Sequence, residues 1–205
     1  MAKMKTVWGI DIGQCALKAV KLRGDGESPP EIEAYEVVEH AGVLSQPDVD
    51  VNVMIQASLD EFLRRVDLGG ATVAVSVFGQ SIMRFVKLPP VEAKRIPDIV
   101  RFEAEQQIPF PLKDMVWRYQ TFYEADSPDI EAGLFAMKTL DVASMLSYFV
   151  RAGIEVDLVQ MAPLSLFNFM QADGQAASDG ATVLADIGAD KTHLVISDGG
   201  RVWTR

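Results

Sequence analysis

One short pattern occurs twice in this chain, near its two ends, and it limits the folds that the sequence can adopt. Asp11–Gly13 reads Asp-Ile-Gly and follows an apolar run from Val7, and Asp186–Gly188 repeats it after a run from Val183. In each copy an apolar strand delivers an aspartate, a glycine turns the chain, and a second strand returns. The sequence therefore predicts two β-hairpins of one design, which could hold a polyphosphate and its Mg²⁺ between them.

The segments between the hairpins predict further strands and helices. Periodicity and turn residues indicate strands over residues 6–12, 15–22, 32–38, 71–78, 81–88, 116–124, 131–138, 155–160 and a hairpin over 182–197, and helices over 55–66, 97–107, 141–151 and 162–172. The first three strands are expected to form an antiparallel meander. The block from 81 to 151 reads strand-helix-strand-strand-helix, so we interpret it as a small α+β subdomain inserted into an α/β domain.

This interpretation gives three parts. Residues 1–79 and 155–178 form the α/β domain, residues 80–154 the insertion, and residues 179–205 the beginning of a second lobe. A lone hairpin is marginally stable, and further strands or a packed helix usually complete it. We therefore expect a fragment of a longer protein, with last strands that are poorly ordered or pair with another copy of the chain through exposed edges.

Composition excludes several classes of function. The 205 residues include 49% hydrophobic residues, enough for a real core, and the net charge of −10 argues against nucleic acid as a partner. Cys15 is the only cysteine, so neither an internal disulfide nor a cysteine-based metal site can form. No apolar run approaches the ~20 residues of a membrane helix, so any membrane role is expected to go through a partner.

The two hairpins resemble the phosphate-binding loops of the actin and hexokinase superfamily, and the insertion resembles that of the cell-division protein FtsA. Arg101–Pro111, which reads RFEAEQQIPFP, resembles a helix-end signature of the family of the type IV pilus assembly protein PilM. The strand Arg84–Pro89 and the turn at Gly153 resemble that family too. The resemblance covers essentially the whole chain. It implies an actin-like (RNase H-like) ATPase lobe, subdomain 1A, with an FtsA-like, SHS2-like insertion, subdomain 1C, and an incomplete second lobe.

The resemblance also implies a function. The protein would be cytoplasmic, at the inner face of the inner membrane, in the platform of a type IV pilus or of a related secretion or DNA-uptake machine. Members of the family bind the N-terminal cytoplasmic peptide of the membrane protein PilN in a groove around the insertion, beside other platform components. The intact protein would bind ATP and Mg²⁺, whereas this segment alone would hold no nucleotide. A nucleotide-independent peptide-binding scaffold with a decayed ATP site stays open as the alternative, and the insertion argues against a sugar or acetate kinase.

The same resemblance assigns roles in the first hairpin. Asp11, together with Asp186 of the second hairpin, matches the aspartates that hold Mg²⁺ largely through water. Backbone N–H groups of Gly13, Gln14 and Cys15 would cradle phosphate oxygens.

Four further residues complete the expected site. Lys18 matches a lysine that approaches phosphate, and Gly188 and Ala189 form the turn of the second loop. Gln160 matches the position that orients the attacking water in hydrolytic relatives, where PilM sequences more often have Asp.

Other residues are less informative. Gln14 and Cys15 stand where relatives favour small hydroxyl residues, which argues against turnover more than against nucleotide binding, so enzymatic activity stays open. Cys15 is interpreted as a small buried side chain, and His40 and His193 as structural or surface residues. Some of the phenylalanines at positions 78, 85, 102 and 110 are candidates for the peptide groove.

Overall fold

The computed structural model describes residues 4–77, 79, 81–123, 130–174, 180–198 and 201–204. The chain divides into two compact units, one formed by Met1–Val77 with Met145–Arg205 and the other by Phe78–Ser144. None of the helices in the described ranges is long and apolar enough to cross a lipid bilayer.

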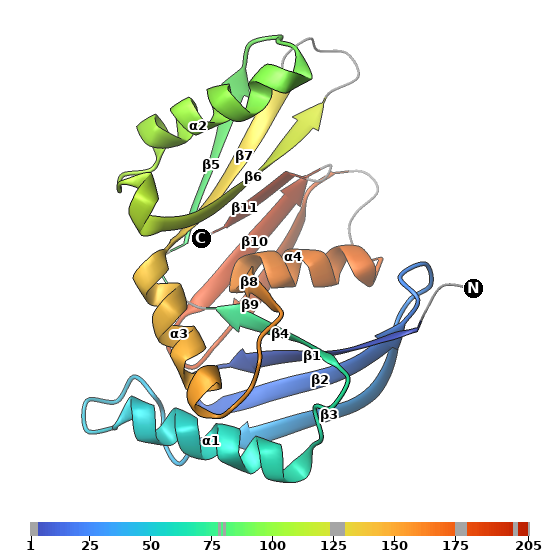
Figure 1. The fold of residues 1–205 in the computed structure, drawn as a ribbon, viewed down its shortest axis with the longest axis vertical. Helices are drawn as coiled ribbons and strands as arrows, with labels where there is room; N and C mark the ends of the chain where they lie inside the picture. The colour runs from blue at the N-terminus through green and yellow to red at the C-terminus, as the bar shows by residue number, and fades with distance from the viewer. Residues whose placement is uncertain are drawn as a thin grey trace. The chain divides into compact units, whose positions relative to one another are not determined.

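A five-stranded sheet organises the first unit (Figure 1). Three antiparallel strands form the predicted meander, namely β1 (Lys5–Ile12), β2 (Ala16–Gly24) and β3 (Glu31–Glu39). Two more strands extend the sheet in parallel with β1, namely β4 (Thr72–Val77) and β8 (Leu158–Met161). The order β3-β2-β1-β4-β8 leaves β3 at one edge.

Helix α1 (Val51–Arg65) packs against one face of this sheet, and the core of the unit lies between the helix and the sheet. The Asp50 carboxylate caps the helix by accepting the N–H groups of Asn52 and Val53 at 3.0 and 3.2 Å. The buried side chains of the helix include Phe62, whose ring meets Trp8 edge to face with centroids 5.6 Å apart. Because side chains alternate along a strand, Trp8 faces this core and Asp11 belongs to the opposite face.

The second hairpin is completed by a strand that was not predicted. β9 (Thr182–Ile187) and β10 (Thr192–Asp198) confirm the expected hairpin, and β11 (Arg201–Thr204) pairs with β10 in the same chain. The expectation that these strands would be poorly ordered or pair with another copy is therefore wrong for β11. Helix α4 (Ala162–Ala172) packs against β9 and β10. Self-association through this sheet stays a prediction.

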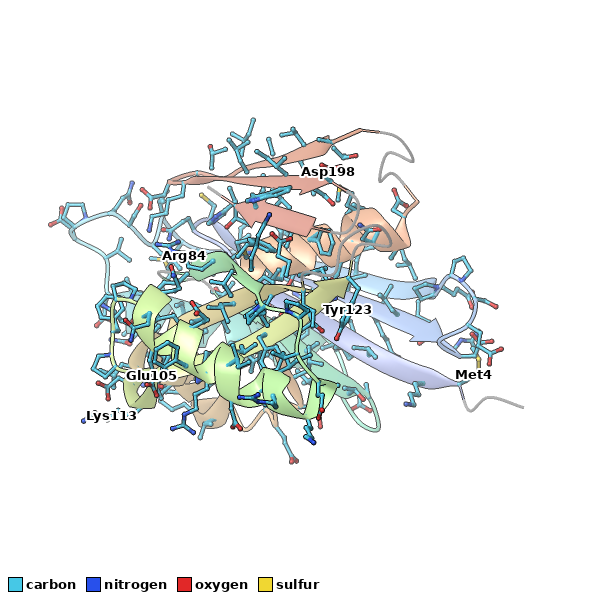
Figure 2. The ribbon with its side chains drawn as sticks, turned by 90° about the horizontal axis from the view of Figure 1, so that it is seen from above. Met4, Arg84, Glu105, Lys113, Tyr123 and Asp198 are labelled. Carbon is cyan, nitrogen blue, oxygen red and sulfur yellow. The ribbon has the colours of Figure 1, made fainter. Side chains whose placement is uncertain are left out.

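The second unit has the predicted strand-helix-strand-strand order. Its antiparallel sheet has the order β5-β7-β6, formed by β5 (Ile82–Leu88), β6 (Met115–Tyr123) and β7 (Ile130–Lys138). Helix α2 (Ile96–Gln107) follows the short 3₁₀ turn Ala93–Arg95, and the 3₁₀ turn Leu112–Asp114 leads into β6. Figure 2 labels Glu105 on α2 and Lys113 in the turn beyond it.

One face of this second sheet packs against α2. Val100 and Ala104 of the helix are fully buried in one cluster with Leu88 and Leu134 of the sheet. The unit ends at residue 144, within helix α3 (Thr139–Arg151), whereas the predicted insertion extended to residue 154. Residues 180–204 belong to the first unit in this division, so their assignment to a second lobe stays a prediction.

Candidate functional site

A cavity of about 640 Å³ lies over the face of the five-stranded sheet that α1 leaves uncovered. Its volume is within the range of about 300–1,000 Å³ that is common for small-molecule sites. Asp11, Lys18, Ser76 and Gln160 are among the residues that line it. The cavity therefore combines three of the predicted site residues with one that the sequence analysis missed.

The register of the sheet explains why these four residues meet. Asp11 on β1 is paired with Lys18 on β2 and with Ser76 on β4, and Ser76 is paired with Gln160 on β8. The four polar residues therefore form one row across four strands.

Helix α4 contributes Ser165 and Asn168 to the cavity. Sequence reasoning missed these two residues and Ser76. A serine inside the otherwise apolar run of β4 was the one signal that could have indicated Ser76.

The turns of the two hairpins have the same geometry. The N–H of Gly13 donates to the Ala16 carbonyl at 2.9 Å, and the N–H of Gly188 donates to the Lys191 carbonyl at 3.0 Å. A Cβ atom would lie 3.2 Å from the Ala16 oxygen at Gly13 and 2.8 Å from the Lys191 oxygen at Gly188. Glycine is favoured at both positions because the opposing carbonyl leaves little room for a side chain.

This geometry corrects one expectation about phosphate donors. The N–H of Gly13 is used inside its own turn and is not free for a ligand. Within the described residues, the N–H groups of Gln14 and Cys15 have no hydrogen-bond partner, and neither do those of Ala189 and Asp190 in the second turn. Each turn thus offers two adjacent backbone donors, an arrangement that suits an anion.

Two side chains of the first turn also differ from expectation. Cys15 is exposed and not buried. Within the described part of the chain, the buried Oε1 atom of Gln14 has no hydrogen-bond partner. A hydrated cation or a ligand hydroxyl could satisfy such an acceptor, because an unpaired buried polar atom is costly.

His40 holds the first turn from outside the hairpin. Its imidazole is 9% exposed, with Nδ1 2.7 Å from Ser58 Oγ and Nε2 3.1 Å from the Gly13 carbonyl oxygen. The Gly13 carbonyl can only accept, so Nε2–H donates to it, and the single proton of the Ser58 hydroxyl is shared between Nδ1 of the neutral ring and the Met54 carbonyl oxygen, 3.1 Å away. Burial lowers the pKa of His40, and the bond to Gly13 opposes that shift.

Two backbone bonds strengthen this connection. The N–H of His40 donates to the Cys15 carbonyl at 2.8 Å, and the N–H of Leu44 donates to the Gln14 carbonyl at 2.9 Å. His40 is therefore a buried support of the turn, a role that the sequence reading did not identify.

The electrostatics of Asp11 connect the two hairpins. Burial raises the pKa of the Asp11 carboxyl above its ordinary 3.8, while a hydrogen bond with Ser76 and the charge of Lys18 lower it. The charge of Asp186 raises the same pKa, and His193, which is paired with Asp186 across β9 and β10, lowers it. The carboxyl groups of Asp11 and Asp186 are therefore close enough to repel one another.

This arrangement fits a hydrated Mg²⁺ better than a metal held in a protein cage. No group of three or more His, Cys, Asp or Glu side chains that could hold a metal occurs in the described ranges. Mg²⁺ commonly keeps several waters and binds one or two carboxylates together with phosphate oxygens. Asp11 and Asp186 are residues of that kind, and the roles assigned to the site residues stay predictions.

Comparisons with known proteins agree with this architecture. The family profile described as type IV pilus assembly protein PilM matches residues 9–205. The structure is similar to that of a PilM-PilN type IV pilus biogenesis complex, with a TM-score of 0.75 and 23% identity over 97% of this chain and 60% of that chain. The chain thus spans about three fifths of that relative's length.

A second similar structure is the cytoplasmic domain of EpsL, an inner membrane component of the type II secretion system of Vibrio cholerae. Its TM-score is 0.58, with 12% identity over 98% of this chain and 71% of that chain. No curated protein sequence matches the chain. The two structural likenesses confirm the predicted α/β, actin-like fold class.

Proposed function

Since the chain belongs to the family of the type IV pilus assembly protein PilM, we propose that it acts in the inner-membrane platform of a type IV pilus or a related machine. It would bind the N-terminal cytoplasmic peptide of a PilN-like membrane protein, which would hold it at the cytoplasmic face of the membrane together with other platform components. We propose further that the intact protein binds Mg-ATP in the cavity beside Asp11. The observation that carries this second proposal is the polar row across β1, β2, β4 and β8, which includes Asp11 and lines the cavity.

The residues of the cavity and of the two turns would divide the work of binding. The free N–H groups of Gln14 and Cys15 in the first turn, and those of Ala189 and Asp190 in the second, would donate to phosphate oxygens. Lys18 would add a positive charge from β2. Asp11 and Asp186 would hold the hydrated Mg²⁺, which neutralises phosphate charge when bound.

The geometry of Gln160 favours binding without turnover. To orient an attacking water, a glutamine would accept a hydrogen bond from it through Oε1. In this structure Oε1 of Gln160 accepts the N–H of Met161 at 3.2 Å, so this acceptor is already engaged. The amide N–H₂ group can still donate to a phosphate oxygen. ATP would then act as a structural ligand.

Calorimetry on the full-length protein that contains this sequence tests the nucleotide site. We expect Mg-ATP to bind, and we expect Asp11→Ala to abolish that binding. Asp60→Ala, a matched change at an exposed aspartate of α1, should leave the binding heat unchanged. A folded wild-type protein that gives no binding heat with Mg-ATP would overturn this part of the proposal.

For the peptide we propose the face of the second sheet that is opposite α2. Register and alternation assign Phe85, Phe122 and Phe135 to this face, around Gly133. A Cβ at Gly133 would lie 3.1 Å from the Phe85 and Phe135 rings and 3.2 Å from the Phe122 ring. Glycine at this position therefore allows the three rings to pack closely around it. Aromatic side chains in such clusters commonly anchor bound peptides.

The other phenylalanines considered from the sequence suit this role less well. Phe102 is 60% exposed on α2, and the Phe110 ring packs on the second core and lies 4.4 Å from the Lys138 ammonium. Phe78 lies outside the described residues. Of the predicted candidates within the described residues, Phe85 is the one that belongs to the aromatic face.

Fluorescence anisotropy with a labelled PilN-like N-terminal peptide tests the aromatic face. We expect Phe122→Ala to weaken binding at least about tenfold, as for an interface hot spot. Phe102→Ala should have no effect, because that ring lies on a different element of the unit. Equal affinities of both variants and the wild type would exclude the aromatic face.

The alternative function, a nucleotide-independent peptide-binding scaffold, is favoured by specific observations. The Gly13 N–H and the Gln160 Oε1 are both engaged within the chain, and an exposed cysteine occupies the first turn. Under this alternative the peptide affinity is unaffected by ATP, by EDTA and by Asp186→Ala. Under the main proposal the intact protein binds Mg-ATP, whether or not the nucleotide changes the affinity for the peptide.

A further inference from the structure

A second cavity in the first unit is not used by either proposed activity. It has a volume of about 760 Å³ and lies between the edge strand β3 and helix α1, and we call it the β3–α1 groove. Its apolar lining includes Val37, Val49, Val53, Met54 and Ala57. Val53 is 65% exposed on α1, so the groove presents an open apolar side chain.

The charges of the groove are unbalanced. Four carboxylates line it, and Arg65 is the only cation in the lining. The Arg65 guanidinium is already engaged by Glu61 at 2.9 Å and by Glu36 at 3.5 Å.

The carboxylates of Glu39 and Asp48 make no hydrogen bond or ion pair with any described residue, whereas the Asp50 carboxylate caps α1. Glu39 is the last residue of β3, Asp48 precedes α1, and both line the groove. The lining of the groove therefore carries uncompensated negative charge.

The backbone of β3 offers a further binding element. β3 is the outer strand of its sheet, so alternate backbone groups on this strand point away from β2. One of them is the Val37 carbonyl, which accepts from Arg65 Nη1 at 3.3 Å. An extended segment placed along such an edge can form main-chain hydrogen bonds while its side chains enter a neighbouring groove.

We propose that the β3–α1 groove binds an extended segment of a partner protein in which basic side chains alternate with apolar ones. Helix α1 has 15 residues and is about 22 Å long, which matches roughly six or seven extended residues. The basic side chains pair with Glu39 and Asp48, and the apolar ones cover Val53 and Met54. Negative charge opposes both a second copy of this chain, whose net charge is −10, and an anionic lipid surface as occupants.

This inference is independent of the nucleotide site. Among the described residues, Val37 alone lines both cavities, and none of the proposed phosphate or metal contacts lines the groove. Loss of nucleotide binding would therefore leave the groove intact, and the reverse also holds.

NMR titration of the chain with an N-acetylated and C-amidated peptide of sequence Lys-Val-Lys-Val-Lys-Val tests the proposal. We expect shifts of the Val53 and Met54 methyl signals, and no such shifts with the peptide in which glutamate replaces lysine. Val53→Lys should weaken binding at least tenfold. Val150→Lys, which makes the same charge change at a valine of α3 that is 73% exposed, should leave it unchanged.

The double variant with Glu39→Gln and Asp48→Asn provides the second arm, because it keeps both side-chain shapes and removes the two charges. We expect a loss of affinity for the lysine peptide of at least tenfold. Equal weakening by Val53→Lys and Val150→Lys would show unspecific attraction and overturn the proposal. Concentration-dependent dimers that Val53→Lys abolishes would show that the groove is a contact between copies, which would also overturn it.

Discussion

The first turn, at Gly13, and the second turn, at Gly188, share one backbone hydrogen bond and have very different surroundings. Ile12 is 4% exposed inside the core of the first sheet, whereas Ile187, at the same place in the second hairpin, is 80% exposed. Neighbours in sequence thus determine the turn, whereas burial by distant residues raises the pKa of Asp11, which precedes the first turn.

Support from outside the hairpin is the second difference. His40 and Leu44 bond to the carbonyl groups of the first turn. Within the described residues, no element outside the second hairpin bonds to Gly188, Ala189 or Asp190. We therefore expect the first turn to be rigid and the second to depend on its own hairpin.

The largest expected difference concerns the two cores. Leu59 is fully buried under the first sheet, whereas Leu194 of β10 is 37% exposed. Leu59→Ala should lower the free energy of unfolding by about 2–5 kcal/mol, and Leu194→Ala should cost about 1 kcal/mol or less. Urea denaturation followed by tryptophan fluorescence measures both changes. Equal costs would contradict the difference in burial.

The next effect concerns the support of the first turn. His40→Ala leaves the Gly13 carbonyl without its side-chain partner and removes one of the two contacts of the Ser58 hydroxyl, and should cost about 1–3 kcal/mol. Hydrogen exchange should quicken at the amides of residues 40 and 44, while the amides of β9 and β10 keep their protection. Equal acceleration in both hairpins would show a global loss of stability and not a local support.

The pH dependence of this support follows from the lowered pKa of His40. The unfolded chain takes up a proton near the ordinary histidine pKa of 6.5, and the folded chain does so only at lower pH. The contribution of His40 is thus present above pH 6.5 and is lost as pH falls through the folded-state pKa. His40→Ala should flatten the stability profile in that window, which denaturation at several pH values measures.

A smaller effect separates the two aspartates. Because burial raises the pKa of Asp11, the ionised carboxyl destabilises the fold at neutral pH, and this cost disappears as pH falls toward 3.8. Asp11→Asn should therefore raise the free energy of unfolding near pH 7 by about 1 kcal/mol or less. Asp186→Asn should change stability little, while lowering the pKa of Asp11 in an NMR titration. If the pKa of Asp11 is the same in the wild type and in Asp186→Asn, the two carboxyl groups are not close to one another.

The features that the sequence predicted are the locally encoded ones. Asp-Ile-Gly between two apolar runs specifies a hairpin. The bounds of α2 were predicted well because Pro97 lies in its first turn and Pro109 lies just beyond its end. Asp11 stood out through the repeated Asp-Ile-Gly pattern, whereas Lys18 and Gln160 were selected through the family resemblance. The order of elements in the second unit followed from periodicity and turn residues.

The features that the sequence missed depend on contacts between distant segments. His40 is 27 residues from Gly13, and nothing in the loop around it indicates that its ring is buried between that turn and α1. Ser76 gains its position from the parallel pairing of β4 with β1 and β8. The strand β11 is short, with four residues, and no local pattern indicated that Cys15 is exposed. Such positions follow from tertiary packing and not from local pattern.

Paramagnetic broadening by Mn²⁺-ATP in the full-length protein tests whether the two hairpins bind one metal-phosphate group. We predict that the amide signals of Gln14 and Cys15 broaden together with those of Ala189 and Asp190, at the same concentration of Mn²⁺-ATP, and that Asp11→Ala removes both effects. Broadening confined to one turn, or absent from both while the protein stays folded, would contradict a site shared by the two hairpins.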